Sequence, residues 1–421
     1  MTERFYVAQV LAWRQRRVRI LAVAGRRLFV LVAGMLAAAV AAAASAPVIR
    51  VNGDHFVDGE GRRLRLLGVN LSGLEFAPIH GWNPGDPWAG QTGTPEPDWP
   101  LFRSWGINIV RIPLNEASWS GVTCVDAVGA FGGPPGNRRK ADPGDNYQAA
   151  VKTAVSSAGA QGLLVILDLH WTAPGPWCPM AQNAQADEDH SVAFWRQVAT
   201  TFRGNLGVAF ELFNEPYADG LDGEQDRWQV LRDGGRFTKF ATGGKPGSMA
   251  YEWTAVGMQR LLDVIRSTGA TNVVLAPGVN YTTDLSRWTE FALHDPQRQL
   301  GVAWHAYPKY GAAFGSAEYR QPNYGVNAFR AVQAIMTAGW PVLITEFGDR
   351  NAPGTASAPF AAALLPTADT MGIGYLGWTW DVWQDPANVL IKDATGTPSD
   401  GYGAYVKQHY LCVAAGGAAC H

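Results

Sequence analysis

The segment Val208-Ala209-Phe210-Glu211-Leu212-Phe213-Asn214-Glu215-Pro216 is an apolar run that stops at a turn marked by proline, with a carboxylic acid at the stop. A second run, Pro341-Val342-Leu343-Ile344-Thr345-Glu346-Phe347-Gly348, ends in the same way. Buried parallel strands are continuously apolar, and their carboxyl ends meet at one edge of a sheet or barrel. We therefore expect Glu215 and Glu346 to face one cleft. Two carboxylates flanking one bond are the groups that glycoside cleavage requires.

Strand-like and helix-like segments alternate along the chain outward from these two runs. The predicted strands cover 65–71, 108–113, 163–170, 208–214, 272–277, 301–306, 342–346 and 373–380. The predicted helices cover 99–105, 147–161, 191–202, 249–268, 285–291, 324–338, 359–371 and 403–410. Eight such alternations predict an α/β fold, a (β/α)8 TIM barrel with long βα loops, preceded by a small β-hairpin turned at residues 52–54. The rival, an open doubly wound sheet, usually carries a Gly-rich phosphate loop after its first strand, whereas residues 68–73 contain no GxGxxG.

Length and composition limit the class of protein. The chain has 421 residues, 47% of them hydrophobic, with 17 Trp and a formal net charge of -2. This charge excludes a strong field for nucleic acid or an anionic membrane. Tryptophan is often used to stack on flat apolar faces of ligands, although we expect more than half of these residues to be core.

The first 46 residues are typical of an export signal. A basic region is followed by the apolar run 28–44 and by the small residues Ala44-Ser45-Ala46. Residues 25–30 fit a twin-arginine pattern loosely, but an ordinary signal that happens to contain Arg26-Arg27 is the favoured interpretation. A retained membrane anchor is the weaker alternative, because small alanines fill the second half of the apolar run. We therefore predict a signal peptide over 1–46, a single catalytic domain over 47–421, and a secreted or periplasmic protein that has no membrane segment after cleavage.

Four widely spaced cysteines fit an exported protein. They form no CxxC pair and no metal-ligand spacing with histidine. An oxidising compartment favours disulfides, and three connectivities are open. We expect Cys124 to pair with Cys178, and Cys412 with Cys420.

Polar residues gather where the predicted strands end. They are Arg111, His170, Asn214 with Glu215, His305 with Tyr307, Glu346, and Trp378 with Trp380. On this ordered set, from about Arg65 to Trp380, the chain resembles glycoside hydrolase family 5, the cellulase-type retaining β-glycosidases of the Asn-Glu-Pro barrel clan.

The resemblance implies a role for each matching residue. It makes Glu215 the acid/base and Glu346 the nucleophile, while Asn214 binds the sugar 2-hydroxyl. Substrate-binding or orienting roles fall to Arg111, Tyr307, His305, His170 and Trp378, with Trp380 left open as the sugar platform. We expect the pKa of Glu215 to be raised, Arg111 to keep Glu346 ionised, and the two carboxyl groups to lie roughly 5–5.5 Å apart.

Other polar and aromatic residues have simpler readings. Asp168 and Glu211 lie inside predicted strands and are expected to be structural. The acidic cluster 187–190 is expected to be a solvated helix start, with a metal site as the minor alternative. The loop tryptophans Trp82, Trp88, Trp119, Trp171, Trp177 and Trp383 either line a groove or pack locally.

The sequence thus predicts a monomeric retaining β-glycosidase without metal or cofactor, most simply an endo-β-1,4-glucanase acting on β-linked oligo- or polysaccharide. β-Mannan, β-1,3-glucan, xyloglucan and exo-type substrates are alternatives with the same mechanism, and a glycolipid is a weaker one. A non-catalytic carbohydrate-binding protein would need the tryptophans but not the two glutamates. A metal-dependent hydrolase would need more ligands than His170 and His305 supply at strand ends.

Overall fold

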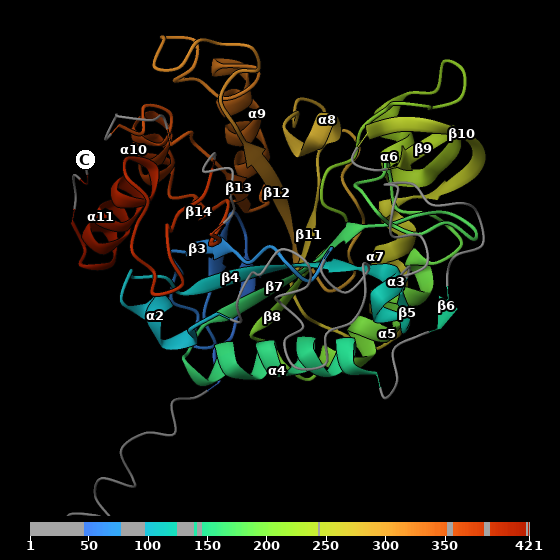
Figure 1. Cartoon of the computed structure of the whole chain (residues 1–421), viewed down its shortest axis with the longest axis horizontal. Coiled ribbons are helices and arrows are strands. Elements are labelled where there is room, and N and C mark those ends of the chain that lie inside the picture. The colour runs from blue at the N-terminus through green and yellow to red at the C-terminus, as the bar shows by residue number, and fades with distance from the viewer. Residues whose placement is uncertain are drawn as a thin grey trace, which may run out of the picture. The chain divides into compact units, whose positions relative to one another are not determined.

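Eight parallel strands close into a barrel in the described part of the chain (Figure 1). The computed structural model describes residues 46–76, 97–123, 139–140, 145–242, 245–351, 357–382, 388–417 and 420. The strands are β3 (Leu67–Asn70), β4 (Ile109–Asn115), β7 (Leu164–Trp171), β8 (Val208–Glu211), β11 (Val274–Ala276), β12 (Leu300–Ala306), β13 (Val342–Phe347) and β14 (Gly374–Gly377). Each coincides with a predicted strand, so the predicted (β/α)8 barrel is confirmed. The export signal, Cys124, Trp82, Trp88, Trp383 and most of the loops after β3 and β4 lie outside the described residues.

Strand register brings polar residues to common levels of the barrel. Asn70 pairs with Arg111 across β3 and β4, and Asp168 pairs with Glu211 across β7 and β8. His305 pairs with Glu346 across β12 and β13. Side chains of paired residues in neighbouring strands lie on the same face, so the register itself gathers charged groups at the carboxyl end.

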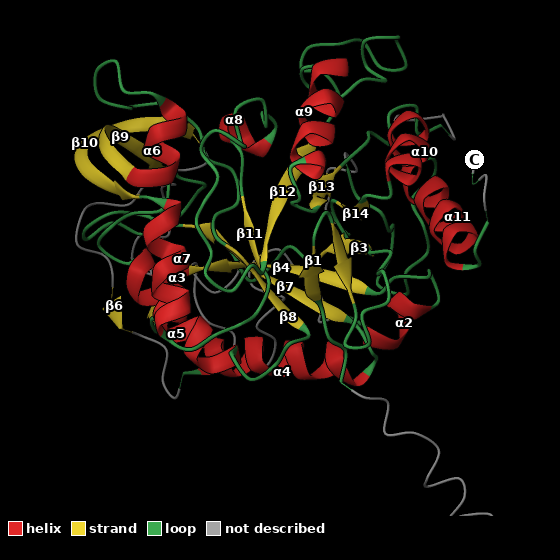
Figure 2. Ribbon diagram, turned by 180° about the vertical axis from the view of Figure 1, so that it is seen from behind, coloured by secondary structure: helices red, strands yellow, loops and turns green. Residues whose placement is uncertain are grey.

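The longer helices cover the outside of the barrel, and short ones lie in the loops at its strand ends (Figure 2). They are α2 (Trp99–Arg103), α3 (Glu116–Trp119), α4 (Asn146–Ala160), α5 (Ser191–Phe202), α6 (Arg227–Asp233), α7 (Met258–Ser267), α8 (Val279–Thr282), α9 (Val326–Thr337), α10 (Ala361–Met371) and α11 (Tyr402–Ala414). A large core between strands and helices includes Trp105, Trp195 and Trp304, each at most 1% exposed. Burial of a Phe side chain stabilises a folded protein by about 1.5–3 kcal/mol, and each of these larger Trp side chains contributes at least as much.

A second, smaller core fills the barrel interior at its amino end. The predicted hairpin, β1 (Arg50–Asn52) with β2 (His55–Val57), brings Phe56 into this core. A Cβ on Gly301 would lie 2.9 Å from the Phe56 ring, so glycine is required on β12 at this point. The hairpin therefore closes the end of the barrel opposite the polar strand ends.

Two predicted helices are wrong, both beyond β8. Residues 249–256 form β10 (Lys245–Val256), paired antiparallel with β9 (Gly234–Thr242), and the helix α7 begins only at Met258. Met249, Tyr251 and Trp253 alternate with exposed residues, and this period of two belongs to a strand. Residues 285–291 form successive turns with i to i+3 bonds rather than a helix. The β9–β10 hairpin and α6 project together at one side of the barrel (Figures 1 and 2).

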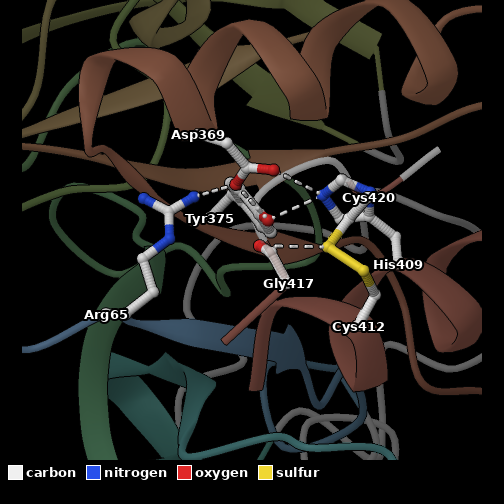
Figure 3. Close-up of a disulfide and its surroundings, with 7 residues drawn as sticks. All are labelled: Arg65, Asp369, Tyr375, His409, Cys412, Gly417 and Cys420. Atoms are coloured by element: carbon white, nitrogen blue, oxygen red, sulfur yellow. Dashed lines mark hydrogen bonds and ion pairs between the residues drawn. A yellow bond between two sulfur atoms is a disulfide. The ribbon is translucent and has the colours of Figure 1, made fainter. Parts of the chain in front are cut away.

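The chain end is fixed by the predicted disulfide between Cys412 and Cys420. Beside it, Asp369 accepts from Arg65, from the Tyr375 hydroxyl at 2.8 Å and from His409 at 3.0 Å (Figure 3). This cluster ties α11 to α10, to β14 and to Arg65, two residues before β3. Cys178 is also in a disulfide, and its predicted partner Cys124 lies outside the described residues.

Short β-ribbons complete the described structure: β5 (Val122–Thr123) pairs with β6 (Arg139–Lys140). Among the described residues, no helix combines the length and the apolar character needed to cross a lipid bilayer.

Candidate active site

The predicted strand-end residues converge at the carboxyl end of the barrel. Arg111 lies on β4, His170 on β7, His305 on β12 and Glu346 on β13. Tyr307 and Trp378 directly follow β12 and β14, and Asn214 and Glu215 lie three and four residues after the end of β8. All eight side chains are therefore carried by strands or by the first residues after them, where the barrel holds them rigidly.

Arg111 is the hub of the buried part of the site. Its guanidinium donates to Glu346 at 2.7 Å and to Glu211 at 2.8 Å, and it forms an ion pair with Asp168 at 3.0 Å. It also donates to the amide oxygens of Asn70 at 3.0 Å and Asn214 at 2.9 Å. Burial opposes its charge, but the three carboxylates outweigh burial and raise the pKa of Arg111. The planar guanidinium thus fixes several strand ends at once.

Asp168 and Glu211, which the sequence predicts to be structural, are the buried carboxyl groups that face Arg111. Burial raises the pKa of Asp168 well above its ordinary value, whereas Arg111 and His305 outweigh burial and lower the pKa of Glu211. Asp168 also accepts from Nδ1 of His170 at 2.6 Å, which fixes the orientation of that ring.

Glu346 is held at both of its oxygens. Oε1 accepts from Arg111, and Oε2 accepts from the Tyr307 hydroxyl at 2.9 Å. Burial raises the pKa of Glu346, and the cations His305 and Arg111 oppose this shift without cancelling it. The carboxylate has little rotational freedom, as an attacking group requires.

His305 stands between the two glutamates. Its Nδ1 lies 2.8 Å from Oε1 of Glu215 and 3.5 Å from Oε2 of Glu346. Burial opposes its charge, but the charge of Glu346, the carboxylate of Glu211 at 3.7 Å and the hydrogen bond with Glu215 raise the pKa of His305 to about 10. His305 is therefore an imidazolium in the free protein at neutral pH.

The predicted rise in the pKa of Glu215 is wrong for the free protein. Burial does act to raise it, but the hydrogen bond and charge of His305 outweigh burial and hold the pKa of Glu215 below its ordinary value. The sequence contains both residues, but their 2.8 Å contact joins strands β8 and β12 and is set by tertiary structure.

Trp378, rather than Trp380, faces the site. The ring of Trp378 lies parallel to that of His170, with 5.7 Å between ring centroids and 10° between planes. Trp380 is 6% exposed and packs in the core against Phe102 and Trp105. Trp119 and Trp177 are also buried, so local packing accounts for them, while Trp171 is half-buried beside Phe76.

Several contacts around Glu215 come from residues that carry no sequence signal. Nε2 of Gln182 donates to Oε2 of Glu215 at 2.9 Å and to its backbone carbonyl at 3.1 Å. In α8, Thr282 donates to the carbonyl of Asn214 at 2.7 Å, and the backbone N–H of Tyr281 donates to that of Pro216 at 2.8 Å. Tyr281 and Thr282 have φ of 61° and 57°, in the left-handed region that non-glycine residues seldom adopt. Backbone strain of this kind is concentrated at functional sites.

Two clusters in the described residues have metal-ligand spacing. In the first, the ligand atoms of Glu215, His305 and Glu346 lie within 4.8 Å of one another, and hydrogen bonds within the site already occupy them. In the second, Asp187 accepts from the backbone of His190, and Asp189 accepts from the backbone of Gly175 at 2.7 Å. These contacts order the start of α5. Asp189 is exposed, but Asp187 is buried, so the prediction of a solvated helix start is wrong for Asp187.

The spacing in the first cluster places Glu215 and Glu346 close enough for one sugar carbon to lie between them. A family model described as Cellulase (glycosyl hydrolase family 5) matches residues 57–383. The chain belongs to glycoside hydrolase family 5.

Relatives within and around this family differ in substrate. Endoglucanase A of Butyrivibrio fibrisolvens is 25% identical over 73% of this chain and 53% of its own length. A mannan endo-1,4-β-mannosidase of Cellvibrio japonicus is 22% identical over 84% of this chain and 64% of its own. The chain thus spans between half and two thirds of the length of these two curated relatives.

Solved structures support the fold. The β-glucanase SdGluc5_26A of Saccharophagus degradans, in complex with cellotetraose, aligns with a TM-score of 0.58 at 22% identity and covers 88% of this chain and 94% of its own. At 22% identity this similarity supports the barrel fold only and gives no information on the substrate of this chain.

Proposed function

We propose that this family 5 protein is a secreted retaining β-glycosidase, in which Glu346 is the nucleophile and Glu215 the general acid/base. The observation that carries the proposal is the close approach of these two glutamates, with oxygen atoms within 4.8 Å of each other. Retaining enzymes hold the two carboxyl groups roughly 5–5.5 Å apart, whereas inverting enzymes leave about 6.5–9.5 Å for a water molecule.

In the first step, Glu346 attacks the anomeric carbon while Glu215 gives its proton to the departing glycosidic oxygen. This forms a covalent glycosyl-enzyme and releases the leaving sugar. In the second step, Glu215 takes a proton from water, the water oxygen attacks the anomeric carbon, and Glu346 departs. Two inversions retain the configuration, and Glu215 ends protonated as it began.

The proton that Glu215 needs comes from His305. In the free protein the imidazolium holds it, 2.8 Å from Oε1 of Glu215. Burial acts to raise the pKa of Glu215 and to lower that of His305. A bound sugar that displaces water strengthens both effects, because desolvation penalises the ion pair. The proton then moves from Nδ1 of His305 to Oε1 of Glu215.

The other site residues bind and orient. Arg111 and Tyr307 fix the two oxygens of Glu346. Because Oδ1 of Asn214 accepts from Arg111, its amide presents the N–H donors to the sugar 2-hydroxyl. His170, aligned by Asp168, and the parallel ring of Trp378 form the floor and platform for the sugar at the cleavage point.

The substrate that we propose is a β-1,4-glucan cleaved internally, with β-mannan as the second candidate because curated relatives include both activities. We also propose a signal peptide over residues 1–46, a single catalytic domain over 47–421 and a monomeric enzyme.

The assignment is tested by the release of reducing sugar from carboxymethylcellulose, mixed-linkage β-glucan, mannan, xylan and laminarin. The wild type and Glu346→Ala are compared on each polymer. Activity on a β-1,4-glucan that is lost in the variant supports a glucanase. Activity on mannan alone would make the protein a mannanase with the same mechanism. Activity of Glu346→Ala equal to that of the wild type would overturn the mechanism.

A further inference from the structure

Gln182 makes two hydrogen bonds to one residue, Glu215. It lies in the long loop between β7 and α5, and its Nε2 is 2.9 Å from Oε2 and 3.1 Å from the backbone carbonyl oxygen. Both atoms are acceptors when Glu215 is ionised, so the amide must direct its NH2 group toward them. The orientation of this side chain is therefore fixed by its partners.

The loop that carries Gln182 is anchored on both sides. The Tyr217 hydroxyl donates to the carbonyl of Gln182 at 3.1 Å, and the Tyr217 backbone N–H donates to that of Ala184 at 3.0 Å. Met180 is buried, and Cys178 is in a disulfide. The segment therefore runs beside residues 215–217 as a fixed support.

Gln182 and His305 divide the two oxygens of Glu215 between them. His305 bonds Oε1 at 2.8 Å, and Gln182 bonds Oε2 at 2.9 Å. With one donor on each oxygen, the plane of the carboxyl group is fixed. Proton transfer depends on such alignment with the reacting oxygen.

We propose, on the basis of the function proposed above, that Gln182 is a positioning residue for Glu215, holding its carboxyl plane toward the glycosidic oxygen and stabilising its ionised form. Charged or titratable groups also act on Glu215 from other elements: Asp168 and His170 on β7, His305 on β12, Tyr307 after it, Glu346 on β13 and Tyr281 in α8. Gln182 differs from all of these because its amide is a neutral donor at every pH.

Loss of the Gln182 donor should change the pKa of Glu215 in a defined direction. A hydrogen bond to the carboxylate lowers its pKa, so its removal raises the pKa of Glu215. The basic limb of the kcat/KM profile reports loss of the proton that His305 and Glu215 hold as a pair in the free enzyme. Removal of a donor from the Glu215 carboxylate makes the pair bind this proton more tightly, so the basic limb moves to higher pH. The plateau falls as well, because the carboxyl group loses its alignment.

The experiment compares Gln182→Met, which keeps the length of the side chain, and Gln182→Glu, which adds a like charge, with the wild type. Substrates are the 4-methylumbelliferyl and 2,4-dinitrophenyl β-cellobiosides, or the mannobiosides if the polymer panel identifies mannan. The first leaving group needs a proton and the second does not. We expect kcat/KM for the first to fall about tenfold in Gln182→Met and kcat/KM for the second to stay within about threefold. The basic limb should move up in both variants, further in Gln182→Glu.

An unmoved basic limb, or an equal loss on both substrates from protein with an unchanged circular dichroism spectrum, overturns the inference and leaves Gln182 a structural loop residue. Glu215→Ala separates this outcome from failure of the proposed function. If Glu215→Ala discriminates strongly between the two substrates and Gln182→Met does not, the inference alone fails. If Glu215→Ala treats both substrates alike, Glu215 is not the acid and both fail.

Discussion

Nδ1 of His305 lies 2.8 Å from Oε1 of Glu215, and this contact sets the protonation of the whole site. It makes Glu215 the more acidic of the two glutamates in the free protein and His305 the proton store. The two residues are 90 positions apart in the chain and are brought together by β8 and β12.

Replacement of His305 by glutamine should narrow the kcat/KM profile. The imidazolium lowers the pKa of Glu346, so its loss moves the acidic limb (ionisation of Glu346) to higher pH. The basic limb (loss of the proton that His305 holds for Glu215) should move to lower pH, because a carboxyl group alone holds this proton less tightly than a histidine whose pKa is about 10. His409→Gln is the matched control, a buried histidine that contacts a carboxylate far from the site. A profile that stays in place in His305→Gln contradicts the proton-store role.

Glu346→Gly should lose essentially all turnover and regain part of it with azide, which can attack the anomeric carbon in the space left by the side chain. The azide product should have the inverted configuration, because one displacement replaces two. The anomer is assigned by proton NMR of the glycosyl azide formed from an activated aryl glycoside. Retained hydrolysis above about one percent without azide, or a product of retained configuration, would sink the nucleophile assignment.

Arg111→Met should lower the free energy of unfolding by about 3–5 kcal/mol, because Asp168, Glu211 and Glu346 would remain buried without their cation. Arg266→Met is the control: Arg266 forms a buried ion pair with Asp295 alone, away from the site, and its loss should cost less. Urea denaturation followed by circular dichroism measures both. Equal losses in the two variants would show that Arg111 is no more than an ordinary buried ion-pair partner.

Trp378→Ala and Trp380→Ala should have opposite profiles. Trp380 packs between Phe102 and Trp105, so its removal should cost about 3–5 kcal/mol of stability. Trp378 lies over His170 at the site, so its removal should lower kcat/KM on the polymer by roughly tenfold or more, with a smaller loss of stability. Thermal unfolding and initial rates, measured on the same preparations, test this prediction. A loss of kcat/KM confined to Trp380→Ala would make Trp380, not Trp378, the sugar platform.

Cys412→Ser with Cys420→Ser should lower the stability of the folded protein by about 2 kcal/mol, since the disulfide closes a short loop of sequence separation 8. Activity at 25 °C should persist, because the cluster of Arg65, Asp369, Tyr375 and His409 still binds α11 to the barrel. Mass spectrometry of the untreated wild type after alkylation should find no modified cysteine. Four alkylated cysteines would end the disulfide assignments.

The sequence by itself determined the barrel. Each strand is a short apolar run, and each run ends at a polar residue. These patterns are local, so they can be recognised in the sequence before any contact is known. The same patterns placed Arg111, His170, Asn214, Glu215, His305, Tyr307, Glu346 and Trp378 at strand ends, and the barrel topology then required them to share one cleft. The β9–β10 hairpin was missed because its apolar residues lead directly into α7, where a period of two was read as part of a longer helix.

Only the tertiary structure decided the energetics of the site. It placed Trp380 in the core and Trp378 in the cleft, although the two are separated by a single residue. It brought Gln182 to Glu215 from a loop with no motif, and it set His305 against Glu215 so that the pKa of the acid falls instead of rising. These outcomes depend on distances of about 3 Å between groups far apart in the chain. Desolvation and hydrogen bonding act over such distances, and a linear pattern of residues does not encode them.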